Sequence, residues 1–423
     1  MSQLIQSVAG AACLAALFFV LRSAIRRSSR VPLPPGPPKL PFIGNLLQLP
    51  SSNEYKVYQR WGEEYDGKIF VTTFSITANL KMRLVSRSGV IHVDAAGTSI
   101  VILNSAKAAW DLLEKRSRIY SSRPPSPMAG DLMGWSWSTG MKPYGESWRA
   151  HRRIVSQALN VNAAKMFRSK QVKATHLLLS QLLEEPEAYF ELLHHHSARI
   201  VMSIAYGLEV KTIDDPWVAI AEDALNPMLD ALNSLPFLKY VPSWFPGAGF
   251  KRKALKWKEL TNRFLNAPFA AAREIVLSGE YDTSFVSESL QRLDDDEPLQ
   301  RQEQEDIVRQ AAGDMYIGGA DTTAAAIVSF IFAMLFVPDV QRKAQEEVDR
   351  VAAGRLPTFE DEQAMPYVTA VVWESLRCYN ITPIGKVLFV WYTAPILKAV
   401  QVHHTIQTLK TRIMVIESPR ARL

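Results

Sequence analysis

The chain has 423 residues, of which 48% are hydrophobic and 21% are charged, and its formal net charge is +6. This composition is that of a globular protein and excludes a disordered or fibrous chain. The basic residues form no long stripe with interleaved aromatic residues, so no nucleic-acid partner is predicted. The two cysteines, Cys13 and Cys378, are far apart in the sequence, which excludes a disulfide framework and a four-cysteine zinc site. No metal-ligand cluster is predicted.

The N-terminus carries an apolar run. Residues 4–21 contain no charged side chain, and four arginines follow within 22–30. Eighteen helical residues span about 27 Å, close to the thickness of a hydrocarbon core. Basic residues on the C-terminal side of the run place the following chain in the cytosol. A cleaved signal peptide, the alternative, would carry its basic residues before the run. We therefore predict that residues 1–30 are a single-pass membrane anchor.

A proline-rich segment follows the anchor. Residues 31–45 read VPLPPGPPKLPFIGN, with five prolines between positions 32 and 38. Such a segment cannot be helical and favours a stiff polyproline II conformation. It is expected to hold the folded body at a fixed distance from the membrane, and an ordinary linker is the alternative.

The body is predicted to be mainly α-helical with a small β-sheet, an α+β fold. Two β-rich runs in 90–103 flank a turn at Ala96–Gly97. Apolar residues recur at three- and four-residue spacing, which predicts helices, in 145–159, 163–183, 254–277 and 338–352. The apolar, aromatic residues 235–253 are expected to form a loop.

One long apolar helix is predicted around GGADTT, residues 318–323. Each glycine costs roughly 1 kcal/mol relative to alanine, and a buried Asp321 costs several kcal/mol without a partner. Small residues around Gly319 would let a flat ligand approach the backbone. Thr322 can bond back to a helix carbonyl or to a bound group, and Asp321 can relay protons. A close helix crossing with a capped kink is the alternative.

Two further motifs pair polar residues at helical spacing. In WRAHR, Trp148 and Arg152 stand at i and i+4, so they share one helix face. An indole N–H and a guanidinium suit carboxylate oxygens, whereas a solvated basic face is the alternative. In ESLR, Glu374 and Arg377 can pair within a helix, and the preceding apolar VTAVVW favours a buried brace over a surface ion pair.

In this order, these motifs resemble those of the microsomal cytochrome P450 family, the haem-thiolate monooxygenases. GGADTT is similar to the family's oxygen-activation helix, WRAHR to its propionate-binding helix and ESLR to its Glu-x-x-Arg brace. Further similar stretches are YSSRP (120–124), AYG (205–207) and PDVQRKAQEEVDRV (338–351). The resemblance covers about residues 31 to 385.

The resemblance implies a cytochrome P450 fold and a haem cofactor. It assigns haem contact to Trp148, Arg152, Gly319 and Thr322, and proton delivery to Asp321 and Thr322. It also implies a lipophilic small-molecule substrate, an NADPH-cytochrome reductase partner, and location in the endoplasmic reticulum membrane with the body in the cytosol.

The C-terminal part departs from the family. The family's iron is held by a cysteine thiolate on a glycine-containing loop after the brace helix, yet no Cys or Gly follows Gly385. Cys378 directly follows Arg377 on the predicted helix, so we expect it to be a small buried residue pointing away from the brace. Residues His403 and His404 are expected to be solvated.

Two segments therefore look foreign to the family. Residues 68–89 are a predicted insertion, and residues 386–423 are a predicted aberrant tail that replaces the haem-ligand region of a truncated fold. Both are expected to pack poorly against the core, or at best to form isolated elements on its surface. The sequence then predicts a haem monooxygenase by descent that is inactive as written. The alternative is a membrane-anchored, non-catalytic remnant or binding module of the same fold.

Overall fold

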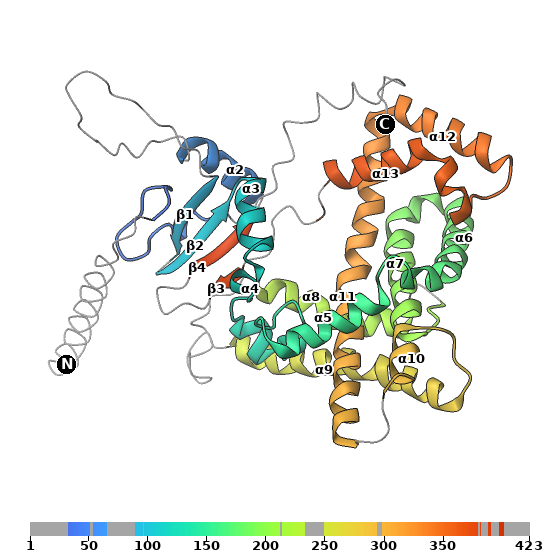
Figure 1. Cartoon of the computed structure of the whole chain (residues 1–423), viewed down its shortest axis with the longest axis horizontal. Coiled ribbons are helices and arrows are strands. Elements are labelled where there is room, and N and C mark those ends of the chain that lie inside the picture. The colour runs from blue at the N-terminus through green and yellow to red at the C-terminus, as the bar shows by residue number, and fades with distance from the viewer. Residues whose placement is uncertain are drawn as a thin grey trace. The chain divides into compact units, whose positions relative to one another are not determined.

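The computed structural model of the chain (Figure 1) describes residues 33–50, 54–65, 89–95, 97–211, 214–232, 249–293, 298–379, 381, 388–390 and 397–401. These residues form two compact units, which divide after Ser122, with residues 388–390 and 397–401 belonging to the first. The predicted anchor, residues 1–30, lies outside the described residues. So does the predicted insertion at 68–89, apart from Gly89.

The first unit, here the sheet unit, is built on four strands and short helices. Its elements are η1 (Leu46–Gln48), α2 (Glu54–Tyr65), β1 (Val90–Ala95), β2 (Thr98–Leu103), α3 (Ala106–Ala109), η2 (Trp110–Glu114), α4 (Ser117–Tyr120), β3 (Leu388–Val390) and β4 (Leu397–Gln401). The strand order is β1-β2-β4-β3. Its apolar core joins α2 to the first two strands, and consists of Tyr58, Trp61, Ile91, Val93 and Ile102.

The predicted hairpin is confirmed. β1 and β2 pair antiparallel from Val90↔Leu103 to Ala95↔Thr98. The turn is tight because Gly97 adopts a positive φ of 85°, and its N–H donates to Asp94 Oδ1 at 2.7 Å. Glycine reaches this backbone region without a steric cost.

Part of the predicted aberrant tail belongs to this sheet. β4 runs parallel to β2, with Ser99↔Leu397 through Leu103↔Gln401 in register, and β3 pairs antiparallel with β4. These two stretches of residues 386–423 therefore form strands, the kind of element that the prediction of poor packing allowed at best. Backbone pairing with β2 requires no family-like side chains, which is why the sequence pattern did not reveal it.

The proline-rich segment is also part of the sheet unit, in contrast to the stand-off linker that was predicted. The His92 N–H donates to Pro35 O at 2.8 Å, and a Cβ on Gly36 would lie only 2.0 Å from His92 O. The buried Asn45 amide donates to Pro37 O and Pro38 O, both at 3.1 Å. These contacts fix the described part of the segment, from residue 33 onward, along β1.

The second unit, here the helical unit, holds the longer helices. Its elements are η3 (Pro127–Leu132), η4 (Trp135–Trp137), α5 (Glu146–Ala158), η5 (Ala163–Phe167), α6 (Arg168–Glu184), η6 (Pro186–Ala188), α7 (Tyr189–Tyr206), α8 (Pro216–Leu232), α9 (Gly249–Ser278), α10 (Phe285–Leu290), α11 (Pro298–Phe336), α12 (Pro338–Ala352), η8 (Phe359–Ala364) and α13 (Pro366–Cys378). The four predicted helices are confirmed as α5, α6 with η5, α9 and α12. The predicted loop at 235–253 is wrong for residues 249–253, which begin α9.

The 39-residue helix α11 is the central element of the helical unit. It packs lengthwise against α7 and also contacts α5, α9, α10 and α13, as its course through the unit in Figure 1 shows. Within the described part of the chain, it contains the one segment, Gln300–Phe336, long and apolar enough to cross a membrane. Only 22% of its apolar window is buried, and the large apolar side chains Phe332, Leu335 and Phe336 at its C-terminal end are exposed.

Candidate functional site

Helix α5 is fixed to α11 by the histidine of WRAHR, His151. His151 is 1% exposed, and its Nε2 lies 3.0 Å from Gln310 Oε1 on α11. The same oxygen accepts a hydrogen bond from Lys142 Nζ at 3.2 Å. One turn further along α11, Asp314 accepts from Ser138 Oγ at 2.6 Å. These contacts set the position of the predicted carboxylate-binding residues relative to α11.

Trp148 and Arg152 share a face of α5, as predicted from their spacing. The Arg152 guanidinium carbon lies 5.7 Å from the centre of the Trp148 ring. Beside them is Arg123, whose Nε and Nη1 atoms are buried without a hydrogen-bond partner in the described part of the chain. Burial lowers the pKa of Arg123, and the nearby charge of Arg152 lowers it further. A buried, incompletely bonded guanidinium beside another cation costs free energy unless an anion joins them.

This arrangement suits a ligand that carries carboxylates. Two guanidinium groups and an indole N–H are donors that match planar acid groups, and the two propionates of haem are such groups. The residues present therefore fit the acid edge of haem. Sequence reasoning missed Arg123, although it lies within the YSSRP stretch. The two prolines that follow it, Pro124 and Pro125, were the available signal for a fixed backbone.

The two glycines of the hexad have different surroundings. A Cβ on Gly319 would lie 2.7 Å from Val201 Cγ2 on α7, whereas a Cβ on Gly318 would meet no atom within 4 Å. Gly319 therefore serves the close crossing of α11 and α7, which was the alternative reading of the motif. The small residue that leaves an open face is Gly318. Thr322, one turn later on this face, donates its hydroxyl to Gly318 O at 2.6 Å.

Asp321 is not buried, in contrast to the sequence-based expectation. Its side chain is 56% exposed, and Oδ1 lies 2.9 Å from His194 Nε2 on α7. This hydrogen bond lowers the pKa of Asp321. His194 is not among the site residues predicted from the sequence. The run of three histidines at 194–196 was the signal that would have found it.

The predicted brace exists, but it is only partly buried. Arg377 Nε donates to Glu374 Oε2 at 2.7 Å, and the two side chains are 26% and 29% exposed. The predicted direction of Cys378 is wrong, because its Sγ lies 3.4 Å from Glu374 Oε1. Residues 374 and 378 are one helical turn apart, and that spacing places them on the same face. Burial, with the Glu374 charge, raises the pKa of the Cys378 thiol.

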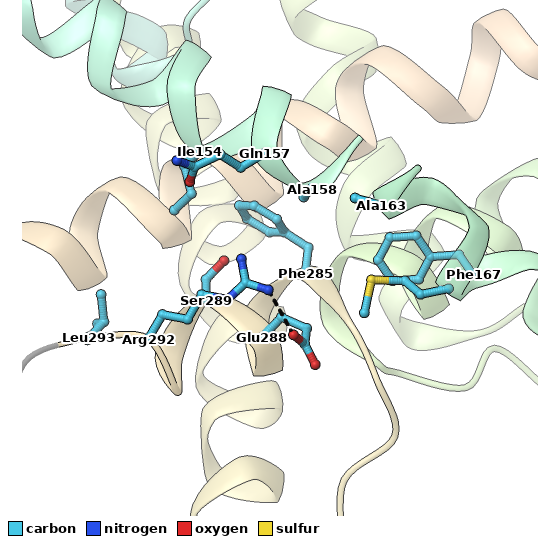
Figure 2. A pocket seen from close by; sticks show the side chains of 11 residues that line it. Ile154, Gln157, Ala158, Ala163, Phe167, Phe285, Glu288, Ser289, Arg292 and Leu293 are labelled. Carbon is cyan, nitrogen blue, oxygen red and sulfur yellow. Dashed lines mark hydrogen bonds and ion pairs between the residues drawn. The ribbon is translucent and has the colours of Figure 1, made fainter. Parts of the chain in front are cut away.

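Two cavities of the helical unit border the helices that carry the predicted site residues. One, of about 570 Å³, is lined by the brace residue Glu374 and by Cys378 together with apolar side chains of α11, α12 and α13. The other, of about 210 Å³, lies between the C-terminal half of α5, η5 and α10, where Arg292 pairs with Glu288 at 3.0 Å (Figure 2). Its volume is below the roughly 300 Å³ of typical ligand sites, so it is not the candidate site.

Comparison with known proteins identifies the family. A sequence model of cytochrome P450 matches residues 86–388. The chain is 41% identical over 368 residues to cytochrome P450 monooxygenase 98 of Postia placenta, an alignment covering 85% of this chain and 66% of the relative. It is 39% identical over 360 residues to cytochrome P450 monooxygenase ple1 of Rhodocybe pseudopiperita, covering 84% and 64%. It is 36% identical over 371 residues to tryptamine 4-monooxygenase of Psilocybe cyanescens, covering 85% and 68%.

The chain spans about two thirds of the length of these curated relatives. Its mainly helical fold with a small sheet is consistent with the fold of that family. The chain belongs to the cytochrome P450 family.

Proposed function

We propose that the helical unit binds haem through Trp148, Arg152 and Arg123, with the Gly318–Thr322 face of α11 against the ring. The observation that supports this most directly is the buried, incompletely bonded guanidinium of Arg123 beside Arg152. Haem is the cofactor of the family, and when bound it supplies the iron that activates dioxygen. Gly319 contributes by letting α7 approach α11, rather than by touching the cofactor.

The protein residues then have separate tasks. Asp321 and Thr322 are proposed to hold and move protons at the open face of α11. The Glu374–Arg377 pair stiffens α13 at the cavity that Glu374 borders. By descent the activity is the insertion of one oxygen atom into a lipophilic small molecule, with electrons supplied by a reductase.

We further propose that these 423 residues by themselves do not support that activity. The family's axial ligand is a thiolate, and Cys378 has a raised thiol pKa and contacts Glu374. Both features favour the uncharged thiol at neutral pH. The second candidate function is therefore a membrane-anchored binding module of the same fold.

The membrane arrangement is proposed from the sequence. Residues 1–30 would cross the endoplasmic reticulum membrane once and leave the body in the cytosol. Added protease should then digest the body in intact microsomes. A body that remains protected would refute this orientation.

The proposed carboxylate site, formed by Trp148, Arg152 and Arg123, can be tested with two porphyrins. Iron protoporphyrin IX carries two carboxylates and its dimethyl ester carries none, so this site should bind the diacid more tightly. Losing one charged hydrogen-bonding group costs roughly 10-fold in affinity. We expect that loss for the diacid in Arg123→Met and in Arg152→Met, with little change in Arg153→Met, an exposed neighbour on α5. Equal affinity for the diacid and the diester would overturn the proposed cofactor site.

A carbon monoxide difference spectrum of the reduced, haem-loaded chain separates the two candidate functions. We expect no band of the thiolate type, and that result would favour the binding module over the monooxygenase. A thiolate-type band that disappears in Cys378→Ala would instead show that Cys378 is the ligand and that the chain is equipped for oxygen chemistry.

A further inference from the structure

Three helices of the helical unit meet at His194. On one side its Nε2 lies 2.9 Å from Asp321 Oδ1 of α11. On the other side its Nδ1 lies 3.7 Å from Glu222 Oε1 of α8. The imidazole of α7 thus stands between two carboxylates, one on each neighbouring helix. Its side chain is 34% exposed, so solvent can exchange protons with it.

The charges around the imidazole favour its cationic form. Asp321 contributes most to raising the pKa of His194, and Glu222 adds to it. On α7 itself, His195 is the adjacent titratable group, and its pKa is lowered by burial. On α11, the same two carboxylates also act on Tyr316, a phenol whose pKa is raised by burial and by their charges.

The position of Asp321 connects this cluster to the proposed site. Asp321 directly precedes Thr322, whose hydroxyl is held by the Gly318 carbonyl. Successive helical residues point about 100° apart. The bond to His194 therefore directs the carboxylate toward α7, whereas Thr322 belongs to the Gly318 face.

We infer that His194, with Glu222 behind it, is a pH-dependent latch that sets the orientation of the Asp321 carboxylate beside Thr322. His194 is a positioning residue in this scheme, since it acts through Asp321. The inference deepens the proposed function, because it rests on Asp321 and Thr322 being the proton-handling pair. Histidine suits this task, since its charge changes within the physiological pH range.

The two states of the latch follow from the charge on the imidazole. Below its raised pKa, His194 is cationic and holds the anionic carboxylate on the α7 side. Above that pKa, the ion pair is lost and the carboxylate gains the freedom to rotate toward Thr322. Glu222 extends the His194–Asp321 ion pair to a higher pH, because its charge also stabilises the cationic imidazole of His194.

The test uses the full, haem-free chain labelled with ¹³C at threonine methyl groups and at histidine Cε1. We follow the signals of His194 and Thr322 by NMR from about pH 5 to pH 9, a range that spans the histidine titration. The wild-type midpoint of His194 should lie above 6.5, and the Thr322 methyl signal should move with the same midpoint. Asp321→Asn should lower the His194 midpoint most, and Glu222→Gln should lower it less.

His194→Asn should remove the pH response of Thr322. His176→Asn, a change of an exposed histidine on α6, is the matched control and should leave that response unchanged. A Thr322 signal that stays constant over this pH range in the wild type overturns the latch, and so does a response that persists in His194→Asn. Because the experiment contains no haem, its failure is distinct from a failure of the porphyrin-binding test.

Discussion

At the scale of single residues, Gly318 and Gly319 are neighbours with opposite sensitivity to an added methyl group. Gly319→Ala would place a Cβ 2.7 Å from Val201 Cγ2, an overpacking that costs about 1–3 kcal/mol. Gly318→Ala meets no atom within 4 Å and gains roughly 1 kcal/mol of helix propensity. Urea unfolding should therefore show Gly319→Ala less stable and Gly318→Ala more stable than the wild type.

The same pair also tests the placement of the cofactor. Gly318→Ala should weaken haem binding although it stabilises the helix, because the methyl group would occupy the open face. Val201→Ala should restore the stability of Gly319→Ala by removing the clashing methyl groups. If the two glycine variants shift the unfolding midpoint equally and in one direction, the assigned faces of α11 are incorrect.

The reactivity of Cys378 reports its environment. Burial and the neighbouring Glu374 carboxylate raise its pKa above the usual 9.0, so the thiolate is scarce at neutral pH. In a Cys13→Ser background, alkylation by iodoacetamide should be slow at pH 7 and should rise with a midpoint above 9.0. Glu374→Gln removes the negative charge and should move that midpoint down. Fast alkylation of the unchanged thiol at pH 7 would contradict this environment.

At the scale of elements, one carboxylate joins the N-terminal half of α11 to the turn at Ser138–Thr139. Asp314 accepts hydrogen bonds from Ser138 Oγ at 2.6 Å and from the Thr139 N–H at 2.8 Å. Asp314→Ala leaves these donors unpaired, and we expect a loss of about 2–3 kcal/mol in unfolding free energy.

The matched control on the same helix is Asp306→Ala. Asp306 pairs with Arg309 at 2.7 Å, but its side chain is 50% exposed, and such pairs contribute about 0–1 kcal/mol. Chemical denaturation of both variants compares the two sites. Equal losses would mean that the turn at Ser138–Thr139 does not hold α11 in place.

At the scale of the whole molecule, each unit contains a buried histidine that accepts a hydrogen bond from a cation. In the sheet unit, His92 Nδ1 faces Lys39 Nζ at 3.2 Å. In the helical unit, His195 Nε2 faces Arg199 Nη2 at 3.0 Å. These contacts require neutral rings, and burial lowers the pKa of both histidines to about 4.

Acid should therefore weaken both units over the same pH interval. The unfolded histidines have the higher pKa, 6.5, so they take up protons first. Stability is then complete above about pH 6.5 and falls as the pH drops toward 4, by at most roughly 3 kcal/mol per histidine. The unfolding temperature can be measured from pH 7.5 to pH 4. Its dependence on pH should become weaker for the sheet unit in His92→Gln and for the helical unit in His195→Gln. An unchanged pH dependence in either variant would show that its histidine does not control that unit.

The sequence by itself determined the features that depend on local spacing. Alternation around Ala96–Gly97 predicted the hairpin, and three- and four-residue periodicity predicted α5, α6, α9 and α12. Spacings of four and three residues predicted the Trp148–Arg152 and Glu374–Arg377 pairs. Such contacts follow from the geometry of one helix or one turn, so a single chain segment contains all the information they need.

Only the tertiary structure decided which distant segments meet. It brings His194 to Asp321 across 127 positions, places Val201 against Gly319, and joins the tail strand β4 to β2. Burial of Arg123 beside Arg152 likewise arises from packing between elements. These contacts depend on how helices cross and strands pair over long separations, and no short-range spacing rule encodes those choices.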